Sequence, residues 1–258
     1  MRLDRPLVLA CLALITTLLA SSAPAVRAGQ PAALQRTVVV ELFTSQGCSS
    51  CPPADRLLTE LATKGSKGIA VIPLSYHVDY WNYIGWTDPF SSAAWSERQQ
   101  RYAAQFASHR VYTPQVVVDG RSECVGSQRR EVADAIAKAA AREPLATVEL
   151  ATADEGARLA FSVTLDAAAP GAAEMMIAIF ETELKTKVGS GENARRTLHN
   201  DNVVRRLIPV GELAPGQQVS AEQPLELDAG WRRDHLGATL FVQSPETLEI
   251  YGAAAVDL

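Results

Sequence analysis

The sequence predicts an α/β domain over residues 37–143, followed by a β-rich, sandwich-like domain over residues 146–258. Three observations lead to this fold class. An apolar strand-like run, Val38–Phe43, leads into a Cys-x-x-Cys pair at a helix start. Strand-like and helix-like segments then alternate up to about residue 143. Short alternating runs separated by turn residues fill the remainder, as is typical of sandwiches.

The composition describes an ordinary globular protein. Apolar residues make up 47% of the 258-residue chain and charged residues 21%, which excludes a disordered class. The formal charge is −5 and no basic face is apparent. We therefore expect no nucleic-acid partner.

Residues 1–28 have the pattern of a secretory signal. Arg2 and Arg5 precede an apolar run over residues 7–20, and small residues follow at 23, 25 and 28. A retained anchor and a lipid attached to Cys11 are the alternatives, although the run is shorter than the ~20 residues of a spanning helix. We expect a cleaved signal, no membrane association afterwards, and a secreted or periplasmic protein.

The first domain is predicted element by element. Val and Leu dominate the opening strand, Thr37–Phe43, and a helix with apolar three- and four-residue spacing follows from Pro52. The next elements are a strand over 69–74, a helix capped by Ser91 or Ser92 and running to Phe106, a strand over 115–118, a turn at 119–120, a short strand through Cys124, and a helix over 132–141.

The connection after the second predicted strand is unusually aromatic. Residues 76–90 hold six of the sixteen Phe, Trp and Tyr residues of the chain. We expect these side chains, Tyr80, Trp81, Tyr83 and Trp86 among them, to pack a long connection, with a binding surface as the alternative.

The second domain is predicted as seven short strands. They are residues 147–151, 158–165, 175–181, 203–209, 219–227, 238–243 and 248–253.

The cysteines point to redox or metal chemistry. Signal removal leaves Cys48, Cys51 and Cys124, an odd number in a chain too long to need a disulfide framework. A helix start favours a thiolate, so Cys48 is the expected nucleophile and Cys51 the expected resolving thiol. An inert disulfide and a metal site are the alternatives. Cys124 is expected to be a small buried side chain.

Several motifs together carry a family resemblance. The strand, the Cys-x-x-Cys helix start and Thr113-Pro114 before a later strand resemble the thioredoxin fold. The chain is more closely similar to a family of secreted bacterial proteins catalogued as domain of unknown function 1223. The shared motifs are ELFTSQGCSSCPPAD at 41–55, YHVDYW at 76–81, YTPQ at 112–115, and GEN at 191–193 leading through His199 to NVVR at 202–205.

The resemblance implies a thioredoxin-like first domain and two further site features. Pro114 matches the cis proline that faces the cysteines, which would leave the Thr113 backbone free to pair with a substrate chain; an ordinary trans proline is the alternative. Glu41 matches, with a shift of one residue, a buried acid that relays the proton of the second cysteine; a plain hydrogen-bonding role is the alternative.

His77 and Asp79 follow the second strand and are candidates for tuning the thiolate. His77 is also the third ligand of an alternative Cu(I) site with Cys48 and Cys51, although a residue that caps its own loop fits equally. Arg195, Arg196, His199 and Arg205 are interpreted as a solvated face, a polar junction between domains, or an anion site.

Three functions compete. The first is an exported thiol–disulfide oxidoreductase that uses no cofactor and acts on protein or small-molecule thiols and disulfides. The second is a copper-handling module. The third is a non-catalytic binding protein, which would be favoured if the aromatic connection covered the cysteines.

Overall fold

The computed structural model describes residues 36–258. The predicted signal segment, 1–28, lies outside the described residues. Within them, no helix is both long and apolar enough to cross a membrane.

Strands outnumber helices in the described part of the chain. The α-helices are α1 (Pro52–Lys64), α2 (Ala93–Gln105) and α3 (Arg129–Ala140), and short 3₁₀ helices cover Asn82–Ile84, Asp154–Gly156 and Arg233–His235. The strands are β1 (Val38–Thr44), β2 (Val71–His77), β3 (Gln115–Val118), β4 (Ser122–Val125), β5 (Ala146–Ala153), β6 (Arg158–Leu165), β7 (Ala173–Glu181), β8 (Leu184–Lys187), β9 (Thr197–Asn200), β10 (Val203–Leu213), β11 (Gln218–Pro224), β12 (Leu236–Gln243) and β13 (Ile250–Asp257).

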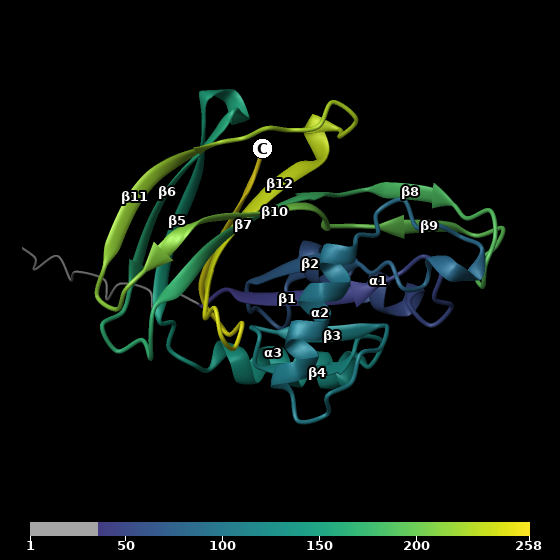
Figure 1. Ribbon diagram of the computed structural model, residues 1–258, viewed down its shortest axis with the longest axis horizontal. Coiled ribbons are helices and arrows are strands. Elements are labelled where there is room, and N and C mark those ends of the chain that lie inside the picture. Colours follow the sequence, from purple (N-terminus) through teal and green to yellow (C-terminus); the bar gives the residue numbers. More distant parts are fainter. Residues whose placement is uncertain (1–35) are drawn as a thin grey trace, which may run out of the picture. The chain divides into compact units, whose positions relative to one another are not determined.

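The predicted fold class is wrong. Strands from both halves of the chain form one eight-stranded mixed sheet in the order β13-β12-β7-β10-β2-β1-β3-β4 (Figure 1). The two halves meet where β10 runs parallel to β2, with Ser75 donating its N–H to the Asn202 carbonyl. Four of the seven strands assigned to a separate sandwich therefore extend the sheet of the first half. There is no clear thioredoxin-like α/β domain followed by an independent β-sandwich.

The elements of the first half lie within three residues of their predicted bounds, but β2 runs on to His77, so Tyr76 and His77 belong to the strand and not, as predicted, to the connection after it. Ser92 caps α2 by accepting the N–H of Ala94, and α1 begins at Pro52 as expected. Successive side chains of β1 point to opposite faces of the sheet. Val38, Val40 and Leu42 pack against α1 and α3, whereas Val39 and Phe43 pack on the α2 side. β1 is thus covered on both faces, which explains its continuous apolarity.

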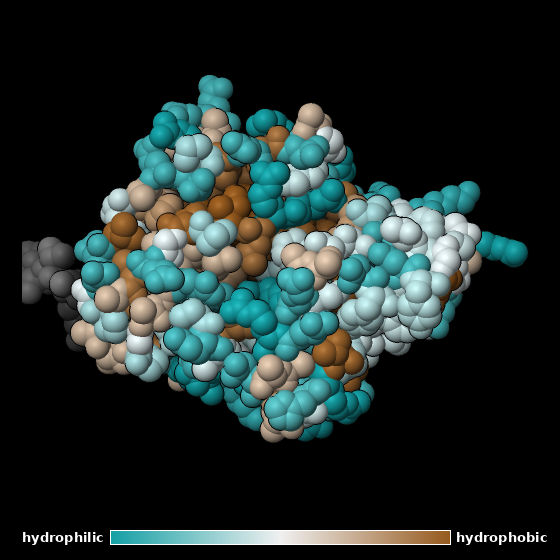
Figure 2. Space-filling model, in the orientation of Figure 1, coloured by the Kyte–Doolittle hydropathy of each residue, from teal (hydrophilic) through white to brown (hydrophobic). Residues whose placement is uncertain are grey.

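The second half adds a smaller sheet over the large one. β11-β6-β5 packs its apolar face, including Leu159 and Val163, against Ile177, Ile179 and Leu240 of the large sheet. Figure 2 shows apolar residues gathered where these two sheets face each other.

The sequence prediction missed the β8–β9 hairpin. It lies beside α1 in Figure 1. Its loop, residues 188–196, reaches the cysteine pair and is called the cover segment below.

Candidate functional site

Cys48 and Cys51 form a disulfide between the end of β1 and the start of α1. Cys51 is the residue before the first helical turn, and its carbonyl accepts the N–H groups of Ala54 and Asp55. Cys48 lies in the preceding turn, where its sulfur is 3.3 Å from the Ser50 hydroxyl. Pro52 and Pro53 carry no N–H, so the helix start offers this site few free donors.

Both sulfur-bearing residues are buried. Cys48 is 1% exposed and Cys51 0%, although Ser49 and Ser50 between them are exposed. A disulfide in this position is out of reach of another protein's thiol until something covering it moves.

The cover segment is one of the groups that bury the pair. The Asn193 amide donates to the carbonyls of Gln46 and Cys48, at 2.9 Å each. Glu192 accepts the Ser49 N–H at 2.9 Å, and hydrogen bonding to the Ser49 side chain and backbone lowers the pKa of the Glu192 carboxyl. The hairpin loop from the second half of the chain is therefore fastened directly to the Cys-x-x-Cys turn.

The aromatic connection supplies the rest of the cover. A Cβ on Gly47 would lie 3.2 Å from Cβ of Trp81 and 3.3 Å from Cδ1 of Ile84, so the connection packs closely on the residue before Cys48. The Trp81 indole donates to the Thr113 hydroxyl at 2.8 Å, and the Trp86 indole donates to the Gln46 side chain at 3.3 Å. Ser190 also bonds the Gly85 carbonyl, which joins the cover segment to this connection.

Thr113 and Pro114 lie at the same end of the sheet as the cysteine pair. The peptide bond between them is cis. Phe43 pairs with Gln115 in antiparallel register, which puts Thr113-Pro114 beside the end of β1. Within residues 36–258 the Thr113 backbone makes no hydrogen bond, whereas the Pro114 carbonyl accepts the Gly126 N–H at 2.9 Å.

A buried acid lies one helical turn beyond Cys51. Asp55 is 7% exposed and accepts the Thr44 hydroxyl at 2.8 Å. Burial raises the pKa of this carboxyl to about 6, against the opposing effects of His77 and the Thr44 hydrogen bond. Residues four apart share a helix face, so Asp55 is on the same side of α1 as Cys51.

His77 is completely buried beside this acid. Its Nδ1 lies 2.7 Å from a carboxylate oxygen of Asp88, and Thr44 is its register partner on β1. Burial alone would lower the pKa of His77, but the charge and hydrogen bond of Asp88 together with the charge of Asp55 outweigh that effect, and the net pKa is raised. Among the described residues, the Nε2 atom of His77 has no hydrogen-bond partner.

Two other predicted site residues are engaged elsewhere. Glu41 points to the α2 side of β1, where its carboxylate lies 2.7 Å from Nε of Arg98 and bonds the Tyr102 hydroxyl. Asp79 binds Ser96 of α2, whose hydroxyl donates at 2.5 Å. The relay role of Glu41 and the tuning role of Asp79 stay predictions, and their partners favour structural roles.

A metal site receives no support from this geometry. In residues 36–258 no three His, Cys, Asp or Glu side chains are placed to hold a metal ion, and this includes the alternative set of Cys48, Cys51 and His77. Cys124 is a free, half-buried thiol on β4, and burial raises its pKa to about 12.

The sequence prediction missed Asp55, Asp88, Glu192 and Asn193 as site residues. Asp55 had a local signal, because an acid four residues after Cys51 on a helix must share its face. The other three reach the site through long-range folding, from 42 to 147 residues away from Gln46 or Ser49.

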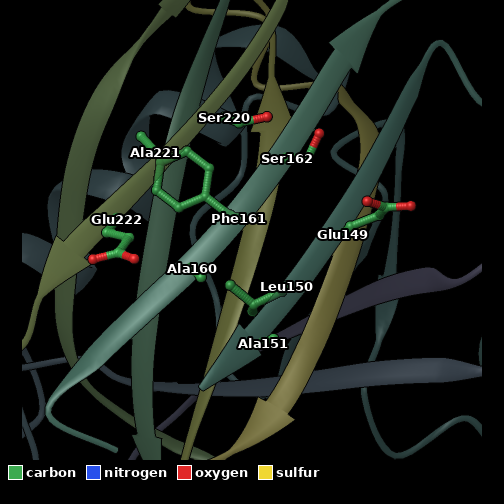
Figure 3. A pocket seen from close by; sticks show the side chains of 9 residues that line it. All are labelled: Glu149, Leu150, Ala151, Ala160, Phe161, Ser162, Ser220, Ala221 and Glu222. Atoms are coloured by element: carbon green, nitrogen blue, oxygen red, sulfur yellow. The ribbon is translucent and has the colours of Figure 1, made fainter. Parts of the chain in front are cut away.

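Three cavities in residues 36–258 lie in two different parts of the fold. One is a shallow groove across β5, β6 and β11, lined by alanines and serines, the apolar side chains of Leu150 and Phe161, and two glutamates (Figure 3). None of its residues belongs to the cysteine site. Two others adjoin the start of α1 and share Pro52, Arg56, Thr197 and Leu198.

Comparison with known proteins gives one family and two informative structures. The family model described as "Protein of unknown function (DUF1223)" matches residues 39–243. A crystal structure of a protein from Agrobacterium tumefaciens is 30% identical and covers 85% of this chain and 93% of its own, with a TM-score of 0.69. HBP35 of Porphyromonas gingivalis covers 87% of this chain and 76% of its own at 15% identity and a TM-score of 0.62, a likeness of fold alone. No curated protein matches the sequence.

Proposed function

Since the chain belongs to the DUF1223 family, whose function is unknown, we propose from its site that the Cys48–Cys51 pair carries out thiol–disulfide exchange with restricted access. The observation that carries the proposal is a disulfide at a helix start with a buried acid of raised pKa one turn further on. The proposed setting is outside the cytoplasm, in keeping with the signal-like pattern of residues 1–28.

In the proposed exchange, Cys48 is the residue that reacts with the substrate. Its thiolate attacks a substrate disulfide, or, in the reverse direction, a substrate thiolate attacks its sulfur. Cys48 lies in the turn rather than in the helix, and the Ser50 hydroxyl at 3.3 Å can donate to its thiolate. Cys51, which is 0% exposed, reacts only with Cys48. The pair then cycles between a disulfide and two thiols.

Asp55 is proposed as the group that exchanges a proton with Cys51. A carboxyl with a pKa of about 6 is a better match to a thiol than an ordinary carboxyl, because proton transfer is most effective between groups of similar pKa. The Thr44 hydrogen bond holds its orientation. This assigns to Asp55 the role that the sequence predicted for Glu41.

The proposed substrates are thiols and disulfides that are small, or are presented on a thin segment. Cys48 is 1% exposed, Asn193 of the cover segment is bonded to its carbonyl, and Trp81 packs on the preceding Gly47, so a bulky protein disulfide cannot approach. The unpaired Thr113 backbone is the proposed place for a substrate chain to bind, once Trp81 moves aside.

The test is whether the disulfide opens in the folded protein. The native protein should show one slowly reacting thiol, Cys124, and dithiothreitol under native conditions should expose Cys48 and Cys51 as well. Equilibration in glutathione buffers would then give the reduction potential. The variant C124S should behave as the wild type, and C48S should give no reversible exchange.

A non-catalytic binding role is the second candidate, and the burial of both cysteines favours it. Under this alternative the disulfide is a permanent cross-link. If dithiothreitol leaves the pair oxidised until the protein unfolds, the exchange function is wrong and this alternative stands.

A further inference from the structure

Positive charge is concentrated on the β8–β9 hairpin. Residues 184–200 contain Lys185, Lys187, Arg195 and Arg196 but one acidic residue, Glu192, in a chain whose net charge is −5. Lys185 pairs across the hairpin with His199, so these two side chains share a face.

The hairpin and α1 enclose two adjoining cavities of ≈ 480 and ≈ 510 Å³, which we call the α1–β9 groove. These volumes are in the range of pockets for small molecules. The groove begins at Ser49, which lies between the two cysteines, and at Pro52, which follows Cys51, and it continues along Arg56 to His199.

The acidic side chains in the groove already have hydrogen-bond or ion-pair partners, and Asp201 keeps its negative charge, because, against the effect of burial, its hydrogen bonds lower the pKa of its carboxyl. Glu60 forms two bonds with Arg129, at 2.6 and 2.7 Å. Asp201 accepts the hydroxyls of Thr59 at 2.6 Å and Thr182 at 2.8 Å. Asp55 is buried against Thr44.

The basic side chains of the groove are less fully engaged, although Arg56 lies near enough to Asp55 and Glu60, and His199 near enough to Asp201, to favour the ionised forms of these carboxyls. Within residues 36–258, Arg56 and His199 form no ion pair and their side chains no hydrogen bond. Arg196 bonds the neutral amide oxygen of Asn193 at 2.9 Å. Two guanidinium groups are therefore available to an anion beside the disulfide, and guanidinium groups bind carboxylates in a bidentate manner.

We propose that the α1–β9 groove binds the carboxylate groups of a low-molecular-weight thiol or disulfide, and that Arg56 and Arg196 select anionic over cationic substrates. This rests on the proposed exchange at Cys48–Cys51. In the oxidising direction, the reduced protein attacks a disulfide RSSR, one RSH leaves, Cys51 displaces the second RSH from Cys48, and the Cys48–Cys51 bond forms. Two thiols of the protein are oxidised and one RSSR is reduced to two RSH.

Binding is tested separately from reaction. Titration calorimetry of the oxidised protein with S-methylglutathione, which carries carboxylates but no free thiol, should show saturable binding that weakens as salt is added. The double variant R56Q/R196Q should bind at least tenfold more weakly. K138Q removes one positive charge from the last turn of α3 and should bind as the wild type does.

Reaction is tested with two disulfides of opposite charge. Oxidised glutathione should oxidise the reduced protein at least tenfold faster than cystamine does, and R56Q/R196Q should lose most of that preference. Absence of S-methylglutathione binding, or equal binding by the variant, overturns the groove proposal. Binding without oxidation by either disulfide leaves the groove standing and overturns the exchange function instead.

Discussion

Asp55 illustrates how burial changes one residue's chemistry. The same aspartate on the open surface of α1 would be a simple helix-start acid, but here it lies under the cysteine turn with Thr44 and His77 around it. Burial disfavours its charge and raises its pKa to about 6. The residue is therefore costly to the fold when ionised, and this is measurable.

Replacing Asp55 with Asn should stabilise the protein above pH 6. The pKa of Asp55 is raised from 3.8 to about 6 in the folded state. Between these two pH values the native state binds more protons than the unfolded state does, so the stability of the wild type falls as the pH rises from 3.8 to about 6. At pH 7 the variant should be more stable by up to about 3 kcal/mol, and at pH 3 the two should be equal.

Urea unfolding between pH 3 and 7 measures this difference. D134N, on the exposed face of α3, is the control and should follow the wild-type curve. A constant difference between D55N and wild type at every pH would contradict the prediction. In the exchange reaction, D55N should also lose the part of the pH dependence centred near pH 6.

Replacing Glu41 with Gln should destabilise the protein by about 3–5 kcal/mol, because it leaves the buried Arg98 guanidinium without its carboxylate. The double variant E41Q/R98M should lose less than the sum of the two single changes. Denaturant melts of all four proteins give this coupling. If E41Q is as stable as wild type but shifts the pH profile of exchange, Glu41 is the relay and Asp55 is not.

At the scale of residues, the sequence predicts the role of a side chain when its partners are close to it along the chain. The pairing chemistry of Cys48 and Cys51 follows from spacing, and Pro114 follows from a motif. Glu192 and Asn193 could not be predicted from spacing, because their contacts with Ser49 and Cys48 exist only after two distant segments have folded together.

At the scale of elements, the loop of the β8–β9 hairpin is bonded to the Cys-x-x-Cys turn. Each of the hairpin's strands is four residues long and contains a single apolar residue, so their alternation of exposed and more buried side chains is too short to predict a strand. Longer elements such as α1, α2 and β6 were predictable because their apolar period persists over more residues.

Removing the Asn193 amide should open the cover segment. The variant N193A loses two hydrogen bonds to the carbonyls of Gln46 and Cys48, each worth about 1 kcal/mol, so reduction of the disulfide by a phosphine should accelerate about tenfold or more. Q223A, which removes an amide from β11, is the control and should react at the wild-type rate. An unchanged rate for N193A would show that the cover segment does not limit access.

At the scale of the molecule, one sheet unites the two halves of the chain. β2 is the junction: it pairs with β1 on one side and with β10 on the other. The two halves also share a hydrophobic core, because Phe43 and Tyr76 of the first half pack in one cluster with Phe180 and Phe241 of the second. The sequence predicted most of these strands but not their order, since pairing between distant strands leaves no local pattern.

The two halves should therefore not fold separately. We expect residues 29–258 to unfold in one cooperative transition, with coincident circular dichroism and fluorescence curves, and residues 36–145 alone to be insoluble or without a cooperative transition. The fragment would expose one edge of β2 and the apolar faces of Phe43 and Tyr76. A soluble fragment with a sharp transition would contradict this.

The position of the cover segment in the chain has a consequence for biogenesis. Residues 188–196 follow Cys51 by more than half the length of the chain, so during synthesis both thiols emerge long before their cover. A cellular oxidant can reach them only in that interval or when the hairpin lifts. The order of the chain thus sets a time window for disulfide formation, and the finished fold closes it.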